Sequence, residues 1–139
     1  VQEIVSSGQA AEKLEELIRA QGGRPEVVSH PEKLPQAAFI KEVKANESGY
    51  LRSLAARELG VAGLKLGAGR LRKSDPIDPA VGLVLQHRVG DRVEQGDVLA
   101  LIHAKDESSA REASEAVLKA VTLSANPVEP PPDIAEWVG

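Results

Sequence analysis

The sequence predicts an α+β fold with a mixed, mostly antiparallel sheet covered by helices, and three patterns support this prediction. Apolar and polar residues alternate along Phe39–Val43 and Val81–Val89, which is typical of half-buried strands. Near both ends of the chain, apolar residues instead recur every three to four positions, which is typical of amphipathic helices. Two Gly-Asp pairs, Gly90-Asp91 and Gly96-Asp97, predict tight turns between the later strands.

The composition excludes several classes of protein. With 139 residues, 42% of them hydrophobic, the chain is long enough for one domain with a modest core. Only 2% of the residues are aromatic, so the stacking side chains of single-strand nucleic-acid binders are missing, and the net charge of −4 provides no basic surface for DNA. The absence of cysteine excludes disulfides and thiolate metal sites. It also fits a reducing compartment, so we expect a cytoplasmic protein that does not bind a membrane.

Residues 1–22 are expected to form a helix. Ser6 and Gln9 fit a capping box, in which the two side chains satisfy free amide groups at the helix start. The pair Gly22-Gly23 ends the helix, because glycine adopts the left-handed conformation at little cost. One side of the helix is apolar and requires a partner to cover it. This side comprises Ala11, Leu14, Leu17, Ile18 and Gln21.

The next segment, residues 23–37, contains three prolines and no periodicity. We predict a linker there, with a short extended piece at Val27–Val28. The strand at Phe39–Val43 follows, and Asn46–Gly49 is predicted to be a turn.

The middle of the chain is predicted to contain one helix and one strand. Helical spacing of apolar residues favours a short helix over Tyr50–Leu59, which Gly60 should stop. Gly63–Gly69 is predicted to be a strand that runs into a loop, and Pro76 and Pro79 interrupt that loop.

The last part of the chain is predicted to contain two strands, a helix and a tail. Val98–Ile102 is apolar on both faces, which predicts a central strand covered on each side. Ser109 and Glu112 fit a capping box that opens the last helix, Thr122–Ala125 is predicted to be a final strand, and residues 127–139 form a proline-rich tail. The buried side of the helix should comprise Ala113, Ala116, Val117, Ala120 and Val121.

Four cations lie within nine residues, around Gly67 and Gly69. One interpretation is a phosphate cradle, because glycines let backbone amide groups approach an anion and the cations add charge. The interpretation that we favour is a turn whose charges face solvent or another domain, because no helix follows to present its N-terminus. The four cations are Lys65, Arg70, Arg72 and Lys73.

Several other polar residues are candidates for chemistry, and we assign a catalytic, substrate-binding or metal role to none of them. The aspartates lie beside proline or glycine, where they ordinarily start turns. The histidines do not have a metal-ligand spacing, although a catalytic or pH-sensitive role stays open for His87 and His103. The serines near acidic residues have no evident histidine base. These candidates are Asp75, Asp78, Asp91, His30, His87, His103, Ser74, Ser108 and Ser109.

Lys105 ends a string, VGDRVEQGDVLALIHAK, that resembles the biotinyl and lipoyl carrier domains. In those domains a similar hairpin leads to a modified lysine at its exposed tip. Here Asp106–Ser109 follows and is predicted to start a helix instead. We therefore interpret the likeness as shared hairpin geometry and not as shared chemistry.

A series of short motifs gives a second resemblance. The helix QAAEKLEELIRAQGG comes first, and the others follow it in a fixed order. They are Ser48-Gly49-Tyr50, Gly67-Ala68-Gly69-Arg70, Asp75-Pro76-Ile77-Asp78, Val81-Gly82, Gly90-Asp91, Gly96-Asp97 and Ile102–Glu107. Their order and spacing resemble the C-terminal domain of the pyrimidine nucleoside phosphorylases, the family that includes thymidine phosphorylase.

This resemblance implies an α/β-hammerhead fold, related to the barrel-sandwich hybrids. It divides the chain into the end of a preceding α/β domain (residues 1–22), a linker (23–37), the C-terminal domain (38–126) and the tail (127–139). Members are homodimeric pentosyltransferases that use phosphate as co-substrate, and their catalytic and binding residues lie in the preceding domains. We therefore expect this chain to be inactive alone, to need no cofactor, and to have the remainder of the phosphorylase and its dimer mate as partners.

Three alternatives stay open at this point. The enzymatic one is the C-terminal domain of an AMP phosphorylase-type protein, which acts on nucleotides. The others are a biotinyl- or lipoyl-like carrier and a free-standing interaction module. The lack of methionine, including at position 1, predicts that the chain begins inside a longer translation product or has been trimmed. The resemblance does not choose between uridine and thymidine as substrate.

Overall fold

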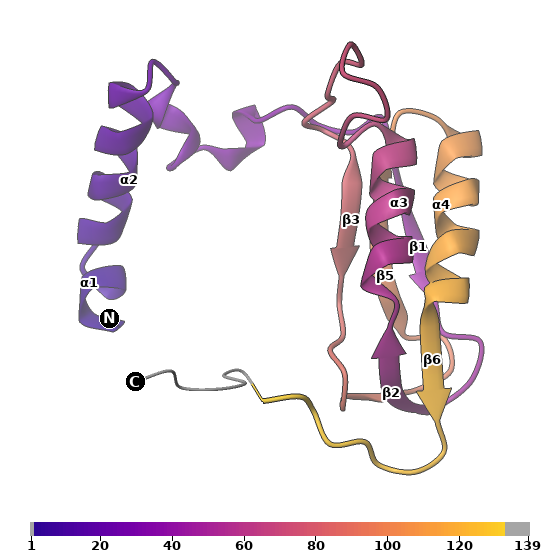
Figure 1. Ribbon diagram of the computed structural model, residues 1–139. Coiled ribbons are helices and arrows are strands. Elements are labelled where there is room, and N and C mark those ends of the chain that lie inside the picture. The colour runs from indigo at the N-terminus through magenta and orange to yellow at the C-terminus, as the bar shows by residue number, and fades with distance from the viewer. Residues whose placement is uncertain (1, 133–139) are drawn as a thin grey trace, which may run out of the picture. The chain divides into compact units, whose positions relative to one another are not determined.

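The computed structural model describes residues 2–132 and divides the chain into two compact units, residues 1–36 and 37–139 (Figure 1). The first unit is helical and the second contains all the strands that the structure describes. Each unit has its own local structure, so we describe them one after the other.

The first unit contains two consecutive helices, α1 (Gln2–Ser6) and α2 (Gln9–Ala20). The predicted capping box is wrong, because the N-cap of α2 is Gly8, in the left-handed conformation with φ 84°, and no side chain caps the helix. The Ser6 hydroxyl instead donates to the Glu3 carbonyl at 3.2 Å. The predicted end is confirmed, since Gly22 is left-handed and the Gly23 amide donates to the Ile18 carbonyl at 2.9 Å.

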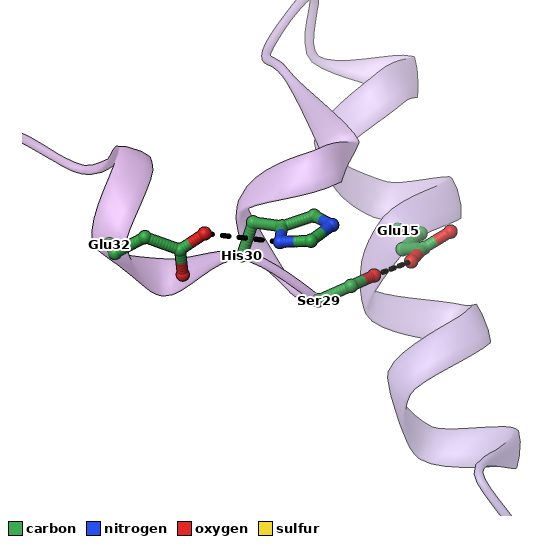
Figure 2. Close-up of polar contacts among 4 residues, drawn as sticks. All are labelled: Glu15, Ser29, His30 and Glu32. Atoms are coloured by element: carbon green, nitrogen blue, oxygen red, sulfur yellow. Dashed lines mark hydrogen bonds and ion pairs between the residues drawn. The ribbon is translucent and has the colours of Figure 1, made fainter.

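Two short 3-10 turns follow, η1 (Pro25–Val27) and η2 (Pro31–Lys33). They replace the predicted extended piece at Val27–Val28, because each proline fixes φ at a value that suits the first position of a helical turn. The Ser29 hydroxyl donates to Glu15 Oε1 of α2 at 3.2 Å, which ties this segment to the helix (Figure 2). Helix α2 buries none of its residues.

The second unit is built on two three-stranded antiparallel sheets, ordered β1-β5-β3 and β4-β2-β6. Helices α3 and α4 lie side by side against the first sheet (Figure 1). Both sheets are open, and the predicted α+β class is confirmed. The elements are β1 (Phe39–Lys44), β2 (Gly49–Leu54), α3 (Ala56–Leu66), β3 (Gly82–Leu85), β4 (Arg92–Val93), β5 (Val98–Ala104), α4 (Glu107–Ala120) and β6 (Val121–Ser124).

The main hydrophobic core lies between the first sheet and the two helices. Strand β5 is central, as predicted, and its alternate residues Ala100, Ile102 and Ala104 are fully buried on the helix side. Small residues of α4 let the helix approach the sheet closely. The buried residues of α4 are Ala110, Ala113, Ser114, Val117 and Ala120.

A second, smaller core covers part of the other face of β5. It comprises the buried residues Ala45, Leu51, Val93 and Leu99, which come from both sheets. The prediction that β5 is covered on each side is therefore confirmed only at Leu99. Further along the same face, Leu101 and His103 are only half-buried.

The middle of the chain departs most from the prediction. The first part of the predicted helix Tyr50–Leu59 is strand β2, because its residues pair with β4 and β6 and this pairing overrides a weak helical spacing. Helix α3 then passes through Gly60 and replaces the predicted strand at Gly63–Gly69, ending at Leu66. A glycine inside a helix costs only about 1 kcal/mol, which tertiary packing readily offsets.

The remaining elements begin or end at other residues than predicted. Strand β3 covers only half of the predicted Val81–Val89, although the Gln86 amide still donates to the Leu99 carbonyl at 2.9 Å. The cap of α4 is Asp106 and not the predicted Ser109. The final strand, β6, begins one residue earlier than predicted. In the proline-rich tail, residues 133–139 lie outside the described part of the chain.

Candidate functional site

The glycine-rich basic segment forms the C-terminal end of α3. Lys65 lies in the last turn of the helix, and Gly67 follows in the left-handed conformation with φ 107°. The Gly67 amide donates to the Leu64 carbonyl and the Ala68 amide to the Gly63 carbonyl, each at 3.1 Å. These amides are therefore used to close the helix. Because the carbonyl end of a helix carries partial negative charge, this geometry does not favour the phosphate-cradle interpretation.

The other three cations lie in the loop after α3. We call residues 68–80 the basic loop. Arg70, Arg72 and Lys73 are all exposed there, and among the described residues no ion pair joins them to a carboxylate. Two large apolar side chains of the same loop, Leu71 and Ile77, are also exposed, by 66% and 49%. Exposed cations that alternate with exposed apolar side chains are typical of a protein contact, not of an anion pocket.

The three candidate aspartates hold turns, as we favoured. Asp75 accepts the Arg72 amide at 2.7 Å, Asp78 accepts the Ala80 amide at 2.9 Å, and Asp91 accepts the Arg88 amide at 2.7 Å. The structure keeps them in separate turns. Across residues 2–132, no three potential metal-ligating side chains gather into one site.

The three histidines lie in different surroundings. Nδ1 of His30 is 3.1 Å from the Glu32 carboxylate in an exposed pair (Figure 2). His87 follows β3, not within it as predicted, and its Nδ1 is 3.9 Å from Oδ2 of Asp91. It lines a groove of about 870 Å³. His103 lies on the outer face of β5, opposite Ile40 of β1.

The serine and lysine candidates lie around the start of α4 and in the basic loop. Ser109 Oγ donates to Oδ1 of Asp106 at 2.8 Å, so its hydroxyl takes part in the helix cap. Ser74 lies in an exposed turn of the basic loop, and Ser108 is exposed in the first turn of α4. Lys105 is exposed in the bend between β5 and α4, as predicted. It therefore does not occupy a hairpin tip, which opposes the carrier interpretation.

Sequence reasoning missed an apolar surface on the first sheet. We call it the open face: the side chains of Ile40, Val84, Leu101 and His103, on the side of the sheet away from α3 and α4. Leu101 pairs with Val84 of β3 and His103 with Ile40 of β1, so the four residues are contiguous. The apolar residues on the second face of β5 are visible in the sequence, but we expected both faces of this strand to be covered.

No helix in the part of the chain that the structure describes is long and apolar enough to cross a membrane.

Comparisons with known proteins agree on one family. The family model described as "Pyrimidine nucleoside phosphorylase C-terminal domain" matches residues 50–124, more than half of the chain. Proteins named pyrimidine-nucleoside phosphorylase from Staphylococcus aureus strains USA300 and COL are each 50% identical over 102 residues. The match covers 73% of this chain and 24% of each relative. This chain thus spans about a quarter of the length of the curated relatives that it matches.

Proposed function

This chain belongs to the pyrimidine nucleoside phosphorylase C-terminal domain family, and we propose that it is the structural domain of an enzyme that cleaves pyrimidine nucleosides with phosphate. The products are the free base and a pentose 1-phosphate, with orthophosphate as the attacking group. The observation that carries this proposal is the 50% identity over 102 residues to the Staphylococcus aureus enzymes. It favours this reaction over the AMP phosphorylase and carrier alternatives.

The domain contributes no catalytic residue in this proposal. Its candidate carboxylates each accept a backbone amide in a turn, and its candidate cradle is the carbonyl end of a helix. The nucleoside, the phosphate and any metal ion are bound by the part of the phosphorylase outside this chain. We propose that this enzyme is a cytoplasmic homodimer and that the domain needs no cofactor of its own.

Phosphorolysis assays test this assignment. The 139-residue chain and the full-length phosphorylase that carries it are each given uridine or thymidine with phosphate, and release of free base is followed. We expect base from the full-length enzyme and none from the chain. Base released by the chain would overturn the structural role, and a full-length protein that cleaves neither nucleoside would overturn the reaction.

The mechanical role that we propose for the domain is bracing. Closure of a cleft over the substrates excludes water and favours phosphate as the attacking group. A rigid C-terminal domain braces the part that moves, and the exposed basic loop provides side chains for that contact. Arginine guanidinium groups are able to form bidentate pairs with carboxylates of a facing domain, and the exposed Leu71 and Ile77 supply apolar area.

Replacing the two arginines of the basic loop in the full-length enzyme tests bracing. We expect Arg70→Ala with Arg72→Ala to lower kcat/KM by about threefold to tenfold, with nucleoside and phosphate affected alike. A loss confined to the KM for phosphate would mean that the loop binds the anion. The matched control is Arg111→Ala, on the exposed side of α4. Unchanged kinetics and unchanged stability of the double variant would rule bracing out.

A further inference from the structure

The open face is an apolar surface in the middle of a sheet. Ile40 is 58% exposed and Val84 is 46% exposed, and Leu101 and His103 between them are only half-buried. Gly82, opposite His103, has no atom within 4 Å of the position a Cβ would take. The space at position 82, beside the histidine, is therefore open among the described residues.

The pattern of this sheet differs from that of a sheet with one solvated face. Such antiparallel sheets alternate apolar residues toward the core with polar residues toward water. On β5 the outward positions are instead Leu99, Leu101 and His103, and the second core buries Leu99. One ion pair lies beside these residues: Glu42, opposite Leu101 on β1, pairs with Lys44 at 3.2 Å. The apolar face thus continues beyond the region that the second core covers within residues 37–132.

We propose that the open face is the surface on which this domain docks against the part of the full-length phosphorylase outside this chain. This inference rests on the proposed function and adds the face that is used. It differs from bracing by the basic loop, because the contact is apolar and lies on the sheet. In this proposal the open space at Gly82 receives an apolar side chain of the preceding domains.

Two observations favour this occupant. The Staphylococcus aureus relatives contain about three-quarters of their length outside the match, since the match covers 24% of each. The matched family is a C-terminal domain, so the additional polypeptide of these relatives precedes it, on the N-terminal side of β1, the strand that carries Ile40. A second copy is a poorer occupant, because a stable dimer needs about 20–30 residues from each partner, whereas a covalently linked domain docks on a smaller area.

Cysteine labelling tests the proposal, because the chain contains no cysteine of its own. Val84→Cys is introduced into the chain and into the full-length enzyme, and modification of that residue by a maleimide is followed by peptide mass spectrometry. The matched control is Thr122→Cys, at an exposed strand position of the other sheet. We expect labelling of position 84 to be at least about tenfold slower in the full-length enzyme, with position 122 unchanged.

Equal labelling of position 84 in the two proteins would overturn the proposal, as would equal slowing at both positions. If position 84 is already labelled slowly in the isolated 139-residue chain, and that chain sediments as a dimer, the face is covered by a second copy and the proposal is wrong. If Val84→Cys does not fold, Ile40→Cys probes the same face on β1. Phosphorolysis activity is also measured on each full-length variant. An active enzyme in which position 84 is labelled as fast as in the chain overturns this inference but not the proposed function. A full-length enzyme without the substitutions that shows no phosphorolysis overturns the proposed function.

Discussion

The Asp106 carboxylate oxygen Oδ1 accepts two hydrogen bonds from Ser109, one from the backbone amide at 2.7 Å and one from the hydroxyl at 2.8 Å. These two bonds begin α4, a helix with five buried residues. The bond from the Ser109 amide, with smaller contributions from its hydroxyl and from Lys105, lowers the pKa of Asp106 below its ordinary value. Charge on Asp106 therefore stabilises the fold.

We expect Asp106→Ala to lower the midpoint of thermal unfolding at neutral pH, whereas Asp106→Asn, which keeps an oxygen acceptor, lowers it less. Because the pKa is lower in the folded state, the stabilisation is complete above the unfolded value, about 3.9, and is lost as the pH falls through the folded value. Asp106→Asn should thus converge on the parent chain in acid, whereas Asp106→Ala approaches it but stays below it, because protonated Asp106 still has an oxygen acceptor. Circular dichroism melts between neutral and acidic pH measure this, and a difference between Asp106→Asn and the parent chain that persists in strong acid would contradict it.

The two Gly-Asp turns are joined to the sheets in the same way. The Gly90 amide donates to the Leu51 carbonyl at 2.8 Å, and the Gly96 amide donates to the Ala45 carbonyl at 2.9 Å. Each turn's aspartate accepts an amide three residues earlier, Asp91 from Arg88 and Asp97 from Glu94. Each turn is therefore bonded to a residue of the second core, Leu51 in one case and Ala45 in the other.

We expect Asp91→Ala and Asp97→Ala each to lower the free energy of unfolding by about 0.5–1.5 kcal/mol, the net worth of one such hydrogen bond. Asp75→Ala is the control, because it breaks the same kind of bond within the exposed basic loop. Urea unfolding compares the three variants. A loss at Asp75 as large as that at Asp91 would show that the bond alone, without its link to the sheets, sets the effect.

Two glycines of α3 should respond to alanine in opposite directions. Gly60 is inside the helix and has no atom within 4 Å of a Cβ, so Gly60→Ala should raise the free energy of unfolding by about 0.5–1 kcal/mol. Gly67 ends the helix with φ 107°, so Gly67→Ala should lower it by about 1 kcal/mol. Chemical unfolding measures both. A Gly60→Ala variant that loses stability would mean that its side is already in contact with other atoms.

The sequence predicted those elements whose local pattern agreed with their tertiary role. The Gly-Asp turns, β5 and the end of α2 were foreseen, because positive φ at glycine and continuous apolar runs are local signals. Residues 50–54 were not, since their leucines fit a helix as well as a strand and only pairing with β4 and β6 decides between them. Gly60 was wrongly predicted to stop a helix for a similar reason, because tertiary packing lets α3 continue through this glycine.

For the candidate site, residue types could be recognised from sequence but their placement could not. Lys65, Arg70, Arg72 and Lys73 were identified as a cluster, yet whether the glycines among them begin or end a helix depends on the extent of α3. The open face could not be foreseen, because the apolar faces of β5 show that partners exist and not which chain supplies them.

The two faces of β5 provide the last prediction. Ile102 is fully buried in the main core, so Ile102→Ala should cost about 2–5 kcal/mol in the chain and in the full-length enzyme alike. Leu101 is the half-buried neighbour of Ile102 on the open face, so Leu101→Ala should lower the free energy of unfolding of the chain by clearly less than Ile102→Ala does. If the open face docks on the rest of the enzyme, the cost of Leu101→Ala should rise in the full-length protein. Denaturant titrations of both variants in both proteins measure this, and an unchanged cost at Leu101 would place the contact elsewhere.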